Sequence, residues 1–556
     1  MTEISSAAPT PLPSSSPSVM SFFPLPQARK SQEVVINEID SVFQSGKKII
    51  LLEAPVGSGK SAIAMTFARK IAAQGKTSHV ITPRKSLQDQ YYSDFYDDVV
   101  LMKGRNAYPC IIDDAPAKFI PILKDIGKGI PPPQPRYDES CATGDCVGNR
   151  AVFTLCTQDR DCPYTTAMEL AQSSPTVVHN LHSFIYQSSF AEKFQARDLL
   201  IIDEAHDIEG VIRDFVAREL SVETPIGFPF TVENNTREEW MAFLLQDELV
   251  PVETTKERAA KEVDPAYQSR RDVYLAQVGA IFGSPLFEKK FSCERSPRQL
   301  PGSKSKEYLD LKFIPHSLGG EPTRYLFDFG AKVLLMSGTI YSKEQFCATL
   351  GLSLDDVHFI RIGSSFPVEN RPIYAKAKYQ TGTSHALWGE NLPTIVKKIQ
   401  DIMGIFKDVK GLIHAPSYAA AEQLVRELKS PRVLTHRPED FLRRLEEFFA
   451  APGNGVFLSP ICQQGVDFKG DRARFQIILR VPYPSTSSEF VQSKVKEDFA
   501  WYNYQALVVF GQQLGRVNRS ESDYGATFLM DERFAKFIGK NTSHLPKWVK
   551  DAIVWK

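Results

Sequence analysis

The sequence lacks net charge, long apolar runs and an abundance of cysteine. Lys and Arg together number 66, as do Asp and Glu, so the formal net charge of the 556 residues is zero. A neutral chain is not a polybasic, histone-like binder, although charge segregated between faces still allows a nucleic-acid partner. No apolar stretch approaches the ~18 residues that span a bilayer, and the first residues lack the pattern of a secretory signal. We therefore expect a cytoplasmic protein.

Eight cysteines are too few for a disulfide scaffold, yet five of them fall within residues 110–162. These five are Cys110, Cys141, Cys146, Cys156 and Cys162. In a reducing compartment, such clustering indicates metal ligands or redox groups rather than bridges. Four thiolates suit an iron-sulphur cluster or zinc, but the four-residue and five-residue gaps that precede Cys146 and Cys162 are looser than in a zinc ribbon. The isolated cysteines, predicted to be packed hydrophobic residues, are Cys293, Cys347 and Cys462.

The remaining composition, 42% hydrophobic and 24% charged, is that of an ordinary globular protein. Residues 1–20 are rich in Ser, Pro and Ala and predict a disordered tail. Beyond them, short apolar runs alternate with helical patterns. The runs are 48–52, 79–81, 176–178, 199–202, 333–336, 411–413, 455–458 and 475–479. This alternation predicts an α/β fold with two doubly wound parallel sheets.

Two stretches interrupt the alternation, and a strand-like run resumes after each, so both are predicted to be insertions into the first α/β domain. Residues 103–165 are rich in Pro, Gly, Asp and Cys and show little periodicity. Residues 207–324 are polar and predict a mostly helical unit, with helices over 237–249 and 267–281. The first domain then comprises residues 21–102, 166–206 and 325–362, and the second comprises residues 363–556.

A phosphate-binding loop is predicted where an apolar run meets a helix-prone segment. Residues 53–61 read Glu-Ala-Pro-Val-Gly-Ser-Gly-Lys-Ser, with Ala54 in place of the usual first Gly. Small residues let backbone N–H groups surround phosphate oxygens at a helix N-terminus, while Lys60 reaches the β and γ phosphates and Ser61 binds Mg²⁺. The residues expected around ATP are Pro55, Gly57, Ser58, Gly59, Lys60 and Ser61.

Two further motifs complete a predicted phosphoryl-transfer site. Asp203-Glu204-Ala205-His206 follows the apolar run 199–202, where sites of parallel sheets form. Asp203 would hold Mg²⁺ and Glu204 would orient the attacking water. Near the C-terminus, Gln512 begins the pattern Gln-x-x-Gly-Arg-x-x-Arg. Its arginines, Arg516 and Arg519, would share one helix face and reach a γ-phosphate across a domain cleft.

With these motifs in order, residues 29–533 resemble the superfamily 2 DNA helicases of the XPD/DinG type. Arg29 and Gln32 stand where that family has adenine-proximal residues, and Asp467 lies in a stretch similar to motif V. Other segments resemble motif Ia at 82–90, the family's Asn-His element at Asn180, motif III at 337–339, motif IV at 414–418 and motif VI at 512–519.

The resemblance implies two RecA-like motor domains, a 4Fe-4S cluster between motifs Ia and II, and an arch domain for the second insertion. Cys162-Pro163-Tyr164 is similar to the family's last cluster ligand. We assign Cys110, Cys146, Cys156 and Cys162 as ligands, with Cys141 as the substitute. In the family's mechanism, Lys60, Asp203, Glu204, Gln512, Arg516 and Arg519 would carry out ATP hydrolysis.

The resemblance thus implies a monomeric, Mg²⁺-dependent ATPase that unwinds DNA with 5′ to 3′ polarity. Its partners would be single-stranded and forked DNA, with RNA in a hybrid as a further ligand and no membrane, and its place the cytoplasm, nucleoid or nucleus. Two alternatives stay open at this point. One is a single-strand translocase or an RNA or R-loop remodeller, and the other is a non-motor protein with a redox or zinc module.

Overall fold

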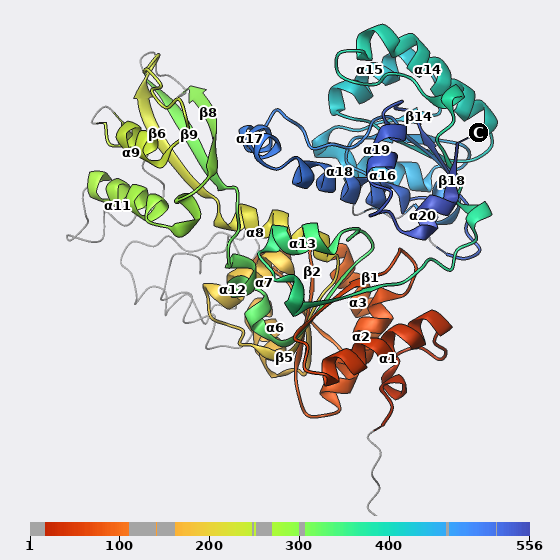
Figure 1. The fold of residues 1–556 in the computed structure, drawn as a ribbon, viewed down its shortest axis with the longest axis horizontal. Helices are drawn as coiled ribbons and strands as arrows, with labels where there is room; N and C mark the ends of the chain where they lie inside the picture. Colours follow the sequence, from red (N-terminus) through yellow and green to blue (C-terminus); the bar gives the residue numbers. More distant parts are fainter. Residues whose placement is uncertain are drawn as a thin grey trace, which may run out of the picture.

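The computed structural model describes residues 17–109, 141, 162–246, 249–251, 270–299, 306–462, 466, 468–518 and 520–555. Five predicted site residues lie outside these ranges: Cys110, Cys146, Cys156, Asp467 and Arg519. The described chain forms two parallel α/β domains and a smaller unit around an antiparallel sheet (Figure 1). The two doubly wound sheets predicted from the sequence are confirmed. Among the described residues, no helix combines the length and the apolar character needed to cross a membrane.

The first domain has a seven-stranded parallel sheet of order β11-β1-β10-β5-β2-β4-β3. Its strands are β1 (Ile49–Glu53), β2 (Ser78–Thr82), β3 (Val100–Met102), β4 (Thr176–Asn180), β5 (Arg197–Ile202), β10 (Gly330–Ser337) and β11 (Val357–Arg361). Its helices are α1 (Lys30–Gln44), α2 (Lys60–Ala72), α3 (Lys85–Phe95), α6 (Pro163–Ser173), α7 (Leu181–Ser189), α8 (Ile208–Val216), α12 (Glu321–Tyr325) and α13 (Lys343–Leu350). Because all strands are parallel, their carboxyl ends meet at one edge, where the predicted motifs gather.

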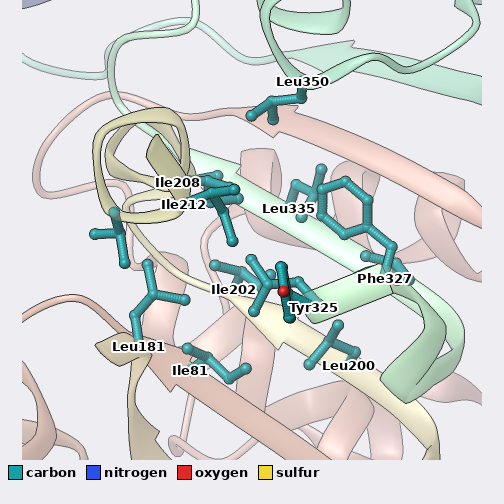
Figure 2. Close-up of a cluster of buried hydrophobic side chains, with 14 of the residues drawn as sticks. Ile81, Leu181, Leu200, Ile202, Ile208, Ile212, Tyr325, Phe327, Leu335 and Leu350 are labelled. Atoms are coloured by element: carbon teal, nitrogen blue, oxygen red, sulfur yellow. The ribbon is translucent and has the colours of Figure 1, made fainter. Parts of the chain in front are cut away.

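Both faces of this sheet are covered, which explains the uninterrupted apolar runs in its strands. On one face, side chains of β1 pack with α1 and α2. On the other, Leu200, Ile202 and Leu335 meet Ile208 and Ile212 of α8 (Figure 2). The helix α8 therefore belongs to the core of the first domain.

The second domain has a seven-stranded parallel sheet of order β14-β15-β13-β16-β17-β12-β18. Its strands are β12 (Ile373–Tyr374), β13 (Gly411–His414), β14 (Val433–Leu434), β15 (Val456–Ser459), β16 (Phe475–Ile478), β17 (Ala526–Leu529) and β18 (Ile553–Val554). Its helices are α14 (Trp388–Ile405), α15 (Tyr418–Leu428), α16 (Phe441–Ala450), α17 (Glu489–Glu497), α18 (Phe499–Leu514), α19 (Phe534–Lys540) and α20 (Lys547–Ala552).

The described residues of the second insertion are not mostly helical, because an antiparallel sheet lies beside its helices, and for these residues the prediction is wrong. Four antiparallel strands in the order β7-β6-β9-β8 form its sheet. The strands are β6 (Arg218–Pro225), β7 (Val250–Pro251), β8 (Phe291–Gln299) and β9 (Lys306–Pro315), with helices α9 (Arg237–Leu244) and α11 (Arg270–Phe282). The apolar residues of β9 alternate, with Leu311 and Phe313 buried against α9 and α11. Such an alternation of period two is the mark of a half-buried strand.

The insertion is also shorter than predicted, and Val19 and Met20, which were expected in a disordered tail, belong to a helical turn. Residues 208–216 form α8 of the first domain, so the inserted sheet begins at Arg218 rather than at residue 207. The chain returns to the first domain after Pro315, where Leu318 and Tyr325 are buried in its core. At the N-terminus, a 3-10 helix spans Val19–Phe22, and Val19 packs with α1 and α2.

Candidate active site

The predicted phosphate-binding loop lies between β1 and α2. Gly57 has φ +76° and Gly59 has φ +80°, backbone conformations that a residue with a side chain rarely adopts. A Cβ at Gly59 would lie 2.2 Å from Nε2 of Gln32, so the site also lacks room for one. Lys60, the first residue of α2, donates from Nζ to the Ala54 carbonyl at 3.2 Å. Its ammonium group is thus held over the loop that would carry the phosphates.

Arg29 and Gln32 are brought to the phosphate-binding loop. Arg29 donates from Nη1 to the Gly57 carbonyl at 2.6 Å, and Gln32 donates from Nε2 to the Ser58 carbonyl at 3.0 Å. The Arg29 backbone N–H in turn donates to Gln32 Oε1 at 2.9 Å. These contacts hold the outer rim of the loop, and the adenine contact assigned to the two residues stays a prediction.

Asp203 is a buried carboxylate at the end of β5. It is 4% exposed, and burial, reinforced by the neighbouring charge of Glu204, raises its pKa to about 6. The Glu204 backbone N–H donates to Asp203 Oδ1 at 2.9 Å, and the Tyr91 hydroxyl donates to Oδ2 at 3.2 Å. A carboxylate that burial makes costly to ionise is stabilised by a divalent cation, so the residues present fit Mg²⁺.

Tyr91 is a site residue that sequence reasoning did not find. Its side chain is buried, and its hydroxyl contacts the predicted Mg²⁺ ligand. Tyr91 lies on α3 one turn beyond Gln88, whose side chain is buried beneath the same sheet edge.

Glu204 is ionised despite its position beside Asp203. Burial alone would raise its pKa, but the nearby positive charges, led by His206 and Lys60, lower the pKa below its ordinary value. Arg516 of the second domain contributes to the same lowering. Glu204 has φ +52°, a strained conformation for a residue with a side chain, and such strain is common at active sites. A charged, partly open carboxylate at this point can orient and polarise a water molecule.

A hydrogen-bonded relay connects this carboxylate site to the second domain. His206 Nδ1 lies 2.8 Å from Ser337 Oγ, and Ser337 Oγ accepts from the Thr339 backbone N–H at 3.1 Å. Gln512, on α18 of the second domain, donates from Nε2 to Thr339 Oγ1 at 2.6 Å. Three of the predicted motifs therefore meet in one chain of contacts.

Arg516 is not on a helix, which corrects the expectation that it shares a helix face with Arg519. The helix α18 ends at Leu514, and Gly515, a residue type that favours helix ends, caps it. Arg516 is 5% exposed and donates from Nη1 to the Val466 carbonyl at 2.6 Å and from Nη2 to Gln512 Oε1 at 3.2 Å. These bonds fix the guanidinium group within electrostatic reach of Glu204.

A cleft of about 620 Å³, partly open to solvent, separates the two domains at this point. Pro55 and Val56 of the phosphate-binding loop form one wall, together with Gly338 and Thr339. The facing wall includes Gln512 and other residues of the second domain. The cleft is built from both domains, so its shape depends on how far they close.

Asn180 also contacts the segment predicted to be motif Ia. Asn180, at the end of β4, donates from Nδ2 to the Pro83 carbonyl at 3.1 Å. Arg84 lies 3.4 Å from Asp207, just beyond the Asp-Glu-Ala-His motif. The sheet edge thus connects the carboxylate site to two loops on the neighbouring strands.

Two cysteines of the first insertion are described, and they lie side by side. The Sγ atoms of Cys141 and Cys162 are 4.0 Å apart, and Cys141 Sγ also lies 3.1 Å from the Pro109 carbonyl. Burial opposes ionisation of Cys162, but hydrogen bonds from Thr165 and Tyr164 at the start of α6 lower its pKa. The pair therefore fits two thiolate ligands of one metal centre. Among the described residues, no group of three or more His, Cys, Asp or Glu side chains forms a metal site.

Comparisons with known families divide along the same two domains. The family described as "Type III restriction enzyme, res subunit" matches residues 25–228, and the family described as "Helicase C-terminal domain" matches residues 401–552. The first match covers the phosphate-binding loop and the Asp-Glu-Ala-His motif. The second covers α18 and Arg516.

Among curated proteins, the Fanconi anemia group J protein homolog of Gallus gallus is 24% identical over 263 residues, 40% of this chain and 21% of the relative. The Homo sapiens regulator of telomere elongation helicase 1 is 29% identical over 175 residues, 25% of this chain and 14% of the relative. The transcription and DNA repair factor IIH helicase subunit XPD of Schizosaccharomyces pombe is 26% identical over 210 residues, 33% of this chain and 27% of the relative. These matches cover well under half of each relative's length.

Solved structures agree over almost the whole chain. An XPD helicase superposes with a TM-score of 0.59 and 15% identity, covering 96% of this chain and 100% of that one. Xpd4 of S. tokodaii gives 0.54 and 14% identity, covering 95% of this chain and 100% of that one. At this identity the likeness shows the fold alone, two RecA-like domains.

Proposed function

The chain belongs to the XPD/DinG-type superfamily 2 helicases, and from this premise we propose that it is an ATP-dependent DNA helicase moving 5′ to 3′ on single-stranded DNA. The observation that carries the proposal is the contact between domains at the carboxylate site. Gln512 of the second domain reaches Thr339 of the first, and the charge of Arg516 lowers the pKa of Glu204. A nucleotide bound there would contact both domains.

The residues of the first domain would bind and activate the substrate. Backbone N–H groups of residues 57–61 and the Lys60 ammonium would hold the phosphates, and Ser61 and Asp203 would hold Mg²⁺. The cation, when bound, neutralises charge on the phosphate oxygens. Glu204 would orient the attacking water, because its charged carboxylate is at the same sheet edge as Asp203.

The second domain would complete the site only when the domains close. Arg516, and with it Arg519, would stabilise the charge that develops on the transferred phosphoryl group. Opening after hydrolysis would withdraw Gln512 and Arg516 together, because both are fixed at the end of α18. Alternate closing and opening would move the two domains along a single strand, which converts hydrolysis into translocation.

We also propose that the first insertion holds a 4Fe-4S cluster. The proximity of Cys141 and Cys162 supports Cys141 as a ligand, with two more of the four thiolates coming from Cys110, Cys146 and Cys156. When bound, such a cluster cross-links a segment that is too poor in apolar residues to form a core. Zinc could use the same pair, so metal content is part of the test.

The motor proposal is tested by K60A, with K76A as the matched control because Lys76 is exposed just beyond α2. K60A should abolish DNA-stimulated ATP hydrolysis, and K76A should retain it. Wild-type protein should unwind a 5′-tailed duplex and not a 3′-tailed one. ATP hydrolysis with single strands but no unwinding of either duplex would identify a translocase, and full turnover by K60A would contradict the phosphate-loop assignment.

The cluster proposal is tested by the visible spectrum and iron content of anaerobically purified protein. C162S should lose both, and should lose unwinding more than ATP hydrolysis. C347A is the control, because Cys347 is buried in the core of the first domain. Colourless wild-type protein with stoichiometric zinc would reject the cluster.

A further inference from the structure

A single buried carboxylate, Glu209, joins the two motor domains outside the ATP site. It lies on α8, directly after the Asp-Glu-Ala-His motif, and is 8% exposed. Its Oε1 accepts from the Trp501 indole N–H at 2.7 Å, and its Oε2 accepts from Gln505 Nε2 at 2.6 Å. Both donors belong to α18 of the second domain, one helical turn apart.

The same carboxylate is connected to the inserted antiparallel sheet. Arg213, one turn further along α8, donates from Nη2 to Glu209 Oε1 at 2.7 Å. Its Nη1 donates to the carbonyl of Pro315, the last residue of β9, at 2.5 Å. The next residue, His316, has Nδ1 2.6 Å from Glu497 Oε2 on α17 of the second domain. Glu209 is therefore where the first domain, the second domain and the root of the insertion meet.

The helix α18 connects this junction to the ATP site. Trp501 and Gln505 lie in its first half, and Gln512, which binds Thr339, lies in its last turn. A helix is a rigid rod over this length. Holding the first half of α18 against Glu209 thus holds Gln512 and the adjacent Arg516 at the carboxylate site.

We infer that Glu209 is a positioning residue that couples closure of the motor domains to the position of the inserted sheet. The inference rests on the proposed function and deepens it. When the domains are closed, the carboxylate has three donors from two domains. When they open, it loses both donors of α18 and keeps Arg213 alone. Hydrogen bonds to a buried charge are strong, so the closed arrangement is favoured, and Arg213 transmits the change to β9.

The test removes the two donors of α18 in the full chain. W501F keeps a ring in the cluster with Ile314 and Phe490 but lacks the indole N–H, and Q505L lacks the amide. The double variant should lower kcat for DNA-stimulated ATP hydrolysis about tenfold and change KM for ATP less than about twofold. Binding is held chiefly by the first domain, whereas turnover needs the second, so kcat changes and KM does not.

Hydrogen exchange gives a readout that local unfolding would not mimic. With a non-hydrolysable ATP analogue and single-stranded DNA, the wild type should gain protection at 60–72 and at 306–315. The double variant should gain it at 60–72 only. The matched control is E489Q, which removes an exposed ion pair with Arg295 between the same insertion and α17 without touching Glu209, and should behave as the wild type.

Equal protection at 306–315 in the wild type and the double variant, or an unchanged kcat, would overturn the inference. If the double variant does not fold, W501F alone is compared with the wild type by the same two measurements, kcat and hydrogen exchange. No protection of 60–72 in the wild type would instead reject the proposed ATP site, so the two failures are distinguishable.

Discussion

Tyr91 illustrates how the core of the first domain supports its chemistry. Its ring is buried among the residues that pack under β5, and its hydroxyl donates to Asp203 Oδ2. The hydrogen bond orients the carboxylate that would bind Mg²⁺. A partner that orients a metal ligand in this way raises the affinity of the site for the metal.

Y91F should therefore raise the Mg²⁺ concentration for half-maximal ATP hydrolysis about tenfold, because the ring stays packed and only the orienting hydroxyl is lost. The measurement is DNA-stimulated hydrolysis over a Mg²⁺ titration. Y92F is the control, since Tyr92 is 48% exposed on the same helix. An unchanged Mg²⁺ dependence in Y91F would remove Tyr91 from the site.

His414 makes stability depend on pH. Burial lowers its pKa from 6.5 to about 4, and the neutral ring lies 2.9 Å from Gln476 Oε1. The unfolded chain takes up a proton near pH 6.5 and the folded chain does not, so His414 contributes stability that is lost as pH falls towards 4. H414Q cannot titrate and keeps an amide donor. Between pH 6.5 and 4, the unfolding free energy of wild type should fall by roughly 3 kcal/mol relative to H414Q. The measurement is urea denaturation of both proteins at each pH. A difference in unfolding free energy between wild type and H414Q that stays the same at every pH would contradict this prediction.

Most residues of the candidate site could be predicted from the sequence, because each must stand at a fixed distance along the chain from the end of a strand. Lys60 follows β1 and Asp203 follows β5 for this reason. Tyr91, Glu209 and Trp501 could not be assigned from the sequence. Their roles arise where separate elements meet, and no spacing along the chain encodes such a meeting.

At the scale of elements, α18 of the second domain packs into the core of the first, where Tyr504 and Val508 are buried. Its Gly511 faces Tyr341, whose backbone has φ +58° and whose N–H donates to Glu53 Oε2 at 2.6 Å. A Cβ at Gly511 would lie 2.0 Å from the Tyr341 hydroxyl oxygen. The close approach of α18 thus requires glycine at this position.

G511A should force the two elements apart and lower kcat for DNA-stimulated ATP hydrolysis about tenfold, with ATP binding retained. G539A on α19 is the matched control, because a Cβ at Gly539 meets no atom within 4 Å. Wild-type turnover by G511A would mean that closure does not depend on this contact.

The elements of the two parallel sheets could be predicted because strands covered on both faces leave continuous apolar runs. The inserted sheet could not, since its strands are half exposed and rich in charge. In β8, apolar Phe291 and Cys293 are followed by Glu294, Arg295 and Arg298, so the alternation is short. A short alternation of apolar and polar residues in a half-exposed strand resembles the pattern of an amphipathic helix.

At the scale of the whole molecule, the inserted sheet has a hydrophobic core of its own. Its core includes Trp240, Phe282 and Phe313, with all buried members between residues 220 and 313. In the described chain, the first domain has one hydrophobic core on each face of its sheet. The buried residues of both cores lie outside residues 218–315. We therefore expect the first domain to fold without the insertion, and the insertion to act in the proposed unwinding.

Removing the insertion separates these roles. Glu219 of β6 and Lys312 of β9 are antiparallel partners, so a short Gly-Ser turn can replace residues 220–311 while Pro315 still meets Arg213. The shortened protein should retain DNA-stimulated ATP hydrolysis, because both walls of the cleft remain. It should unwind a 5′-tailed duplex at least about tenfold more slowly, because closure of the two parallel domains then no longer moves an inserted sheet. Hydrolysis and unwinding are measured on the same preparation, with thermal unfolding as the check that the motor is folded. Unwinding at the wild-type rate would show that the two parallel domains alone separate strands.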